Sequence, residues 1–149
     1  MRTTRMVLLI AGLIAASLAG PLTGVAAADD GGRPLSAEMT GAAEAPGPGD
    51  PDGSGFATFQ VNPGQEEICY TLTASNLDTV TAAHIHVAPV GVPGPVVVPL
   101  VPPVSGTSSA CASVARALAS AILMHPENYY VNVHTTVYPA GAIRGQLHG

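Results

Sequence analysis

Two short stretches decide how this chain folds: Thr81-Ala-Ala-His-Ile-His-Val87 and Tyr129-Tyr-Val-Asn-Val-His-Thr135. Both are rich in β-branched residues, which favour β-strands. Side chains in a strand alternate between its two faces, so His84 and His86 project from the same side of the first stretch. His134 projects from one side of the second stretch. If the two strands lie next to each other, three imidazoles converge on one spot.

Much of the remaining chain shows the same two-residue alternation in short segments. The sequence contains 17 Gly and 14 Pro, which punctuate turns and interrupt helices. Besides the two stretches above and a short polar segment at 107–111, strands are predicted over residues 35–41, 55–61, 67–74, 96–101 and 142–147. About eight short strands predict an all-β fold, a Greek-key antiparallel β-sandwich.

One segment has a helical period instead. Its apolar residues recur at the spacing of an amphipathic helix: Val114, Leu118, Ala121 and Ile122. Ser113 is expected to cap the start of this helix, and Pro126 follows its end. It is the one helix that the sequence predicts in the folded domain.

The first residues have the pattern of a secretory signal peptide. Arg2 and Arg5 form a positive start, residues 6–16 are apolar, and small residues follow as far as Ala28. The alternative is a membrane anchor, but the apolar run is shorter than the ~20 residues that a spanning helix needs. A signal peptide is therefore expected over residues 1–28.

Cleavage after Ala28 would leave a flexible N-terminus, residues 29–34, and one folded domain, residues 35–149, in a secreted, extracellular protein. The remaining chain has three Arg, ten acidic residues and no Lys, a net charge of −7. Such a domain lacks the cations that phosphate contacts require, so nucleic acid is not an expected partner. It has no basic face for anionic lipid, and no membrane span is expected after cleavage.

The chain contains two cysteines, Cys69 and Cys111. In an oxidising compartment an even pair favours a disulfide. The alternative is a reactive thiol, but the sequence has no Lys and few Arg that would lower a thiol pKa. A Cys69–Cys111 disulfide is therefore predicted.

Four stretches resemble a known family. They are Thr81-Ala-Ala-His-Ile-His, Gly-Pro-Val-Val-Val at 94–98, Tyr130-Val-Asn-Val-His-Thr135 and Pro139-Ala-Gly-Ala-Ile-Arg-Gly-Gln-Leu147. Together they resemble the CHRD domain, which is named for chordin and occurs in many exported bacterial proteins. The resemblance covers roughly residues 35–147. It implies a secreted all-β module of unassigned activity and brings no catalytic residues with it.

A second resemblance is to the copper/zinc superoxide dismutases, which are also Greek-key sandwiches. His84, His86 and His134 would match three copper ligands of that family. The sequence departs from the family because no His/Asp cluster for zinc lies between His86 and His134. The expected sandwich is therefore superoxide dismutase-like or immunoglobulin-like, and dismutase chemistry is a distant alternative.

Two interpretations of the three histidines remain open. Neutral imidazoles on a rigid sheet suit copper or zinc, with Asn132 and Arg144 as candidates to support the ligands from behind. Alternatively, the histidines hydrogen-bond neighbouring backbone and tie strands together, as half-buried polar groups must. The distance between the rings of His86 and His134 bears on this choice.

No motif for a common hydrolase is present: the sequence lacks a Gly-x-Ser-x-Gly elbow and a carboxylate pair placed for sugar chemistry. An enzyme is therefore not the favoured interpretation. The main expectation is an extracellular binding or structural module whose partner is unknown, and the alternative is an exported copper- or zinc-binding protein. The stretch Val92–Val104, with six Val and five Pro, is the candidate apolar contact surface.

Overall fold

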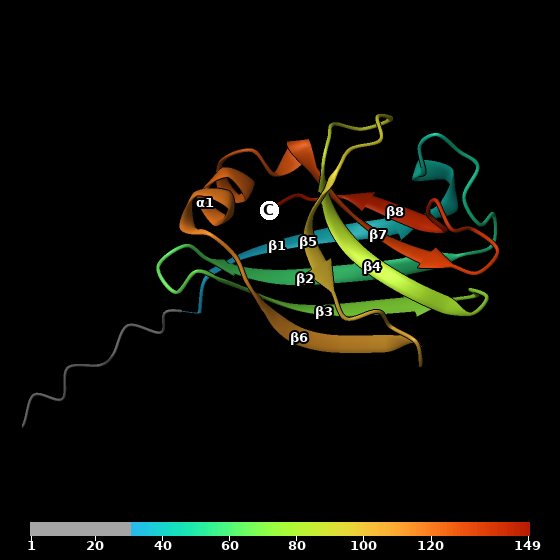
Figure 1. Ribbon diagram of the computed structural model, residues 1–149, viewed down its shortest axis with the longest axis horizontal. Coiled ribbons are helices and arrows are strands. Elements are labelled where there is room, and N and C mark those ends of the chain that lie inside the picture. The colour runs from blue at the N-terminus through green and yellow to red at the C-terminus, as the bar shows by residue number, and fades with distance from the viewer. Residues whose placement is uncertain (1–30) are drawn as a thin grey trace, which may run out of the picture.

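The computed structural model describes residues 31–149 (Figure 1). The predicted signal peptide and the first residues of the predicted flexible segment lie outside this range. The described part contains eight strands, one α-helix and two short 3₁₀ helices. They are β1 (Arg33–Thr40), η1 (Gly41–Ala43), β2 (Ser54–Asn62), β3 (Glu67–Ser75), β4 (Val80–Val87), β5 (Val96–Leu100), β6 (Thr107–Ser113), α1 (Arg116–Met124), η2 (Pro126–Asn128), β7 (Tyr129–Thr135) and β8 (Ile143–Gln146).

All strand pairs are antiparallel, in the order β5-β4-β7-β8-β1-β2-β3-β6. The two edge strands approach each other, so the sheet is a nearly closed sandwich, as Figure 1 shows. The backbone N–H of Val101 donates to the Tyr70 hydroxyl at 2.7 Å, and the Ser108 hydroxyl donates to the Val101 carbonyl at 2.7 Å. With the edges joined, β4, β5 and β6 are neighbours in turn, and β3, which precedes them in the chain, lies next to β6; this arrangement is a Greek key. The predicted fold class is confirmed.

The core lies between the two halves of this sheet and consists mainly of aliphatic side chains. The alternation in β2 and β3 sends every second residue inward, including Phe59, Ile68 and Leu72. From the other half, Ile85 of β4 and Val131 of β7 are fully buried. Because β4 and β7 each have one face in this core, their other face is available for polar residues.

The helix α1 begins two residues later than its apolar stripe suggested. Ser113 belongs to β6, and the N-cap is Ala115, which makes no side-chain capping bond, so the expected Ser113 cap was wrong. The physical reason is that β6 remains paired with β3 as far as Ser113, opposite Glu67. The helix buries Ala119 and Ile122 against the core.

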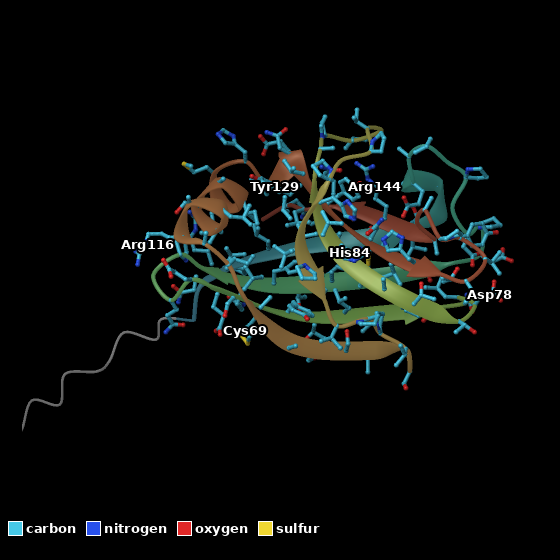
Figure 2. The ribbon with its side chains drawn as sticks, in the orientation of Figure 1. Cys69, Asp78, His84, Arg116, Tyr129 and Arg144 are labelled. Carbon is cyan, nitrogen blue, oxygen red and sulfur yellow. A yellow bond between two sulfur atoms is a disulfide. The ribbon has the colours of Figure 1, made fainter. Side chains whose placement is uncertain are left out.

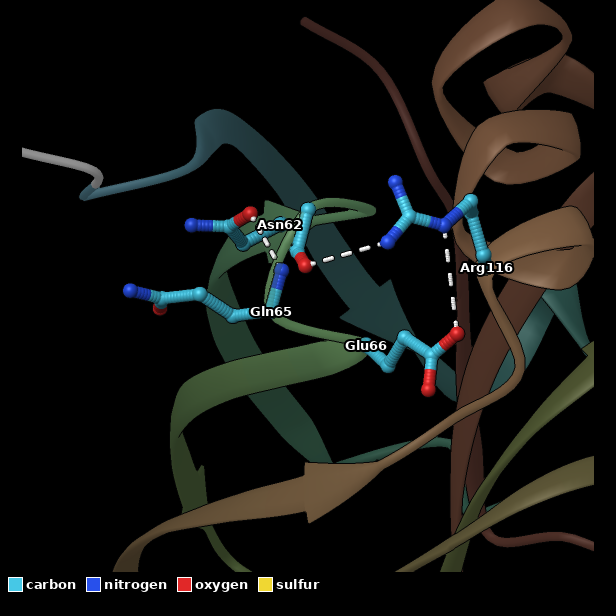
Figure 3. A network of polar contacts seen from close by, with 5 residues as sticks. Asn62, Gln65, Glu66 and Arg116 are labelled. Carbon is cyan, nitrogen blue, oxygen red and sulfur yellow. Dashed lines mark hydrogen bonds and ion pairs between the residues drawn. The ribbon is translucent and has the colours of Figure 1, made fainter.

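A polar contact joins the start of α1 to the β2–β3 turn (Figure 3). The Arg116 guanidinium donates to the Gly64 carbonyl at 3.3 Å and lies 3.9 Å from a Glu66 carboxylate oxygen. The turn itself is closed by the Gln65 N–H, which donates to the Asn62 side chain at 3.0 Å. Both members of the ion pair are more than half exposed, so it contributes less than about 1 kcal/mol.

The disulfide fastens one edge of the sandwich. Cys69 on β3 and Cys111 on β6 lie directly opposite each other in the strand pairing and are bonded, as the sequence predicted; Figure 2 labels Cys69. β6 has hydrogen-bonded strand partners on one side only. The covalent bridge therefore fixes an edge strand to its strand partner.

Replacing both cysteines, Cys69→Ala with Cys111→Ala, is expected to lower the free energy of unfolding by about 4 kcal/mol. The bridge joins residues 42 apart, and the unfolded chain regains that loop's entropy once it is cut. Urea denaturation of the oxidised parent and the double variant measures the change. The control is Thr71→Ala with Ser109→Ala, which removes a 2.9 Å hydrogen bond between the same strands. A loss no larger than in this control would contradict the role of the bridge.

Candidate metal centre

The pairing of β4 with β7 brings the three predicted histidines together. In this antiparallel register Ala82 lies opposite His134, His84 opposite Asn132, and His86 opposite Tyr130. The intervening residues of both strands point into the core, so these side chains all lie on the opposite face. Figure 2 labels His84 on β4.

The ring centroids of His86 and His134 are 6.2 Å apart, those of His84 and His86 5.5 Å, and those of His84 and His134 4.9 Å. One nitrogen from each ring lies within 4.8 Å of the other two. The convergence expected from strand alternation is therefore present. His125 and His148 are not members of this cluster.

Backbone carbonyls fix the protonation of two rings. His86 Nδ1 lies 2.8 Å from the Gly94 carbonyl and His134 Nδ1 lies 3.1 Å from the Pro139 carbonyl. A carbonyl only accepts, so both Nδ1 atoms carry the hydrogen, and in the neutral rings both Nε2 atoms keep a lone pair. The Nε2 of His134 accepts from His84 Nδ1 at 3.0 Å. The Nε2 of His86 is buried and has no hydrogen-bond partner among the described residues.

Burial keeps the half-buried histidines neutral. It lowers the pKa of His84, and repulsion from protonated His134 and His86 lowers it further. Burial also lowers the pKa of His134, against an opposing effect of the hydrogen bond to Pro139. Metal ions bind the neutral form of imidazole, so the lowered pKa values leave these two rings ready to act as ligands near neutral pH.

Asn132, predicted to support a ligand ring, lies on the same face directly opposite His84. Its side chain is almost fully buried, and its Oδ1 has no hydrogen-bond partner in the described part of the chain. The amide is therefore an unused acceptor beside the histidines. Its position agrees with the sequence analysis, but no hydrogen bond from Asn132 to a histidine is present between residues 31 and 149.

Arg144, the other predicted supporting residue, reaches the histidines through Tyr130. Its guanidinium carbon lies 3.4 Å from the centre of the Tyr130 ring, and that ring stacks on His86 with a centroid separation of 4.7 Å and an angle of 9°. Arg144 is only 1% exposed and donates to the Val92 and Pro89 carbonyls, each at 2.9 Å. Figure 2 labels this arginine on β8.

The same contacts fix the loop after β4. Gln146 donates to the Ala88 carbonyl at 2.8 Å, and the Gly94 N–H donates to the Tyr130 hydroxyl at 3.2 Å. Gly94 is required there because a Cβ atom at that position would lie 2.0 Å from the Val87 carbonyl oxygen. The loop in turn holds His86 by its Nδ1, so Arg144, Gln146 and Tyr130 orient a histidine that none of them hydrogen-bonds.

Tyr130 was missed by the sequence analysis, although the same alternation that selected Asn132 and His134 assigns it to their face.

Glu44 was also missed, and no sequence pattern marks it. It follows η1, and its carboxylate lies against Gly141, where a Cβ atom would approach an oxygen to 2.4 Å. Burial raises the Glu44 pKa to about 7, although the positive charge of Arg144 opposes the increase.

The Glu44 carboxyl should make stability depend on pH. In the unfolded chain it ionises near 4.5, whereas in the folded chain it stays protonated up to about 7, so its contribution to stability falls as pH rises between these values. The free energy of unfolding of Glu44→Gln, relative to that of the parent, is therefore expected to rise by about 1 kcal/mol between pH 4 and pH 8. This value is reduced to allow for solvent screening. Urea unfolding at both pH values measures it. A difference that does not change with pH would contradict the assignment.

No helix in residues 31–149 is long and apolar enough to cross a membrane. Several valines of the candidate contact surface are exposed, among them Val92, Val96, Val101 and Val104.

Comparison with known proteins identifies the family. No curated protein and no solved structure matches the chain. The family model described as the CHRD domain matches residues 35–147, which is most of the sequence and includes all three histidines and both cysteines. The chain therefore belongs to the CHRD domain family.

Proposed function

We propose that this CHRD domain is an exported, extracellular module that binds one copper or zinc ion through His84, His86 and His134. The observation that carries the proposal is the buried Nε2 of His86, which has no partner in the described residues. Leaving such an atom unsatisfied costs about 1–3 kcal/mol, and a bond to a metal ion would remove that cost.

The hydrogen bonds made by the Nδ1 atoms of His86 and His134 support the same function. Metal-ligating histidines usually donate their second ring N–H to a carbonyl or carboxylate, which fixes the tautomer and the ring orientation. His86 and His134 both donate Nδ1–H to backbone carbonyls in this way. The three ligand nitrogens lie within 4.8 Å of one another, whereas a metal–nitrogen bond of about 2.1 Å allows at most about 4.2 Å between two ligands. Binding therefore needs small side-chain movements, which include giving up the His84–His134 hydrogen bond so that His134 Nε2 can face the ion.

A purely structural network accounts for only part of these contacts. It explains the His84–His134 hydrogen bond and the bond from His86 to Gly94, both of which tie neighbouring segments together. It does not explain why His86 Nε2 is buried without a partner in the described residues, nor why Asn132 Oδ1 on the same face is also without one. Native structures rarely leave buried polar atoms of this kind unsatisfied unless an ion or water bonds them.

The surroundings favour holding an ion over the turnover of an anion such as superoxide. An anion would be attracted by an exposed cation beside the site. Arg144 is buried and its guanidinium donates to backbone carbonyls, so it is not available for that role. The net charge of the mature chain is negative as well. We therefore assign the site to metal binding, with an open ligand position for water or a small molecule.

Titration of the purified domain with Cu²⁺ and with Zn²⁺ tests the proposal. Isothermal calorimetry is expected to find one ion per chain with a dissociation constant below about 1 μM, equivalent to about 8 kcal/mol. His86→Ala and His134→Ala should each weaken binding at least about tenfold, because each removes one of three ligands.

The matched controls are His125→Ala and His148→Ala, which remove histidines outside the cluster. His125 is exposed and lies 3.4 Å from a Glu127 carboxylate oxygen, and His148 lies 3.5 Å from the Ser36 hydroxyl. Both variants should bind metal as the parent does. If the parent binds neither ion with micromolar affinity, the site is refuted. The site is also refuted if all four variants lose binding equally.

Export is tested separately. Mass spectrometry of the protein recovered from outside the producing cells should find Asp29 as its first residue, because signal peptidase is expected to cut after Ala28. The preceding 28 residues should be absent from it. A chain that keeps Met1 and stays inside the cell would contradict export.

A second candidate function is the binding of another extracellular protein or structural component. It is favoured by the exposure of large apolar side chains in and beside the loop after β4: Val90, Val92, Val96, Val101 and Val104. Isolated apolar residues are common on protein surfaces, but a group of this size on one stretch is typical of a contact surface.

A further inference from the structure

We propose that the stack formed by Arg144, Tyr130 and His86 makes this site select the cuprous ion, Cu⁺, over the divalent ions Cu²⁺ and Zn²⁺. The inference rests on the proposed function, because it concerns the ion held by the same three histidines. It assigns to Arg144 a role as a positioning residue that acts on the ion through charge.

The stack brings a permanent positive charge close to a ligand. The guanidinium carbon of Arg144 is 3.4 Å from the centre of the Tyr130 ring, and the Tyr130 ring is 4.7 Å from His86 and nearly parallel to it. These distances place the charge within about 8 Å of the His86 ring, a range over which buried charges interact strongly. The arginine side chain cannot lose its proton under ordinary conditions, so the charge is always present.

This charge is poorly neutralised. The described residues offer Arg144 no carboxylate within ion-pair distance, and its guanidinium bonds are to the carbonyls of Val92 and Pro89 and to the Gln146 amide oxygen. Glu44 is the acidic residue whose charge affects it, and burial raises the Glu44 pKa to about 7, so the carboxylate is only partly ionised near neutrality. Because Arg144 is 1% exposed, water screens the charge little.

A fixed cation discriminates between ions by their charge. The two copper ions differ by one electron, so the repulsion from Arg144 is twice as large for Cu²⁺ as for Cu⁺. For unit charges about 10 Å apart at an effective dielectric constant of about 20, Coulomb's law gives roughly a tenfold difference in relative affinity. Zn²⁺ meets the same extra repulsion as Cu²⁺. Three neutral imidazoles add no negative charge that would compensate a divalent ion.

The competing explanation is that Arg144 only fastens the loop after β4. In both explanations, losing Arg144 loosens the loop that holds His86, and this loosening by itself lowers the affinity for every ion. They differ in the ratio of the Cu⁺ and Cu²⁺ dissociation constants, which a loosened loop changes little and a removed charge changes in a defined direction. The ratio is therefore the measurement that separates them.

The experiment measures Cu⁺ affinity by competition with bicinchoninate under ascorbate, and Cu²⁺ affinity by competition with nitrilotriacetate in air, on the same domain at pH 7.5. Arg144→Gln is expected to shift the ratio of affinities roughly tenfold towards Cu²⁺. Arg144→Lys keeps the charge but not the planar stack, and should keep the ratio within about threefold of the parent even if both affinities fall.

A third variant leaves the stack untouched, so it also guards against an Arg144→Gln protein that does not fold. Glu44→Gln removes the negative charge that partly offsets Arg144 at pH 7.5, and it should shift the ratio towards Cu⁺. Unchanged ratios in both Arg144→Gln and Glu44→Gln would overturn the inference while leaving metal binding intact. A parent that binds neither copper ion, and no Zn²⁺ in the calorimetric titration, would instead refute the proposed function itself.

Discussion

The register between β4 and β7 is the constraint on which the site depends. Ile85 and Val131 are fully buried and opposite each other, and this apolar pairing fixes which residues of the two strands face away from the core. Because side chains alternate with a period of two, a slip of one residue would send His84 and His86 into the core and bring apolar residues out. The same packing that stabilises the sandwich therefore also sets the distances between the three imidazoles.

Next to these two strands, polar side chains donate hydrogen bonds to backbone carbonyls of the loop after β4, which would otherwise be unpaired. Arg144 and Gln146, two residues apart on β8, share one face and bind carbonyls of the loop after β4. Tyr130 lies between this pair and His86. One contiguous network thus joins β8, β7, the loop and β4, and the geometry of a candidate ligand depends on residues more than fifty positions away in sequence.

Much of this arrangement follows from local patterns. The His-x-His spacing on an alternating strand was enough to predict a shared face, and the alternation in β2, β3 and β7 predicted the all-β fold. The disulfide between the two cysteines could be predicted once an oxidising compartment was inferred. What could not be predicted depends on tertiary contacts: Glu44 becomes buried only when its loop packs against Gly141, and Arg144 reaches His86 only through the Tyr130 ring. The Ser113 cap failed because strand pairing with Glu67 outweighs a local capping preference.

The seam between β5 and β6 has a consequence for how the molecule behaves at high concentration. An open edge strand offers unpaired backbone groups on which a further copy can add, and this is how fibrillar aggregates begin. Here the Tyr70 hydroxyl accepts a hydrogen bond from the Val101 N–H, and the Ser108 hydroxyl donates one to the Val101 carbonyl. Pro99 within β5 has no amide hydrogen to donate. The edge therefore offers a further copy of the chain fewer unpaired backbone groups on which to add.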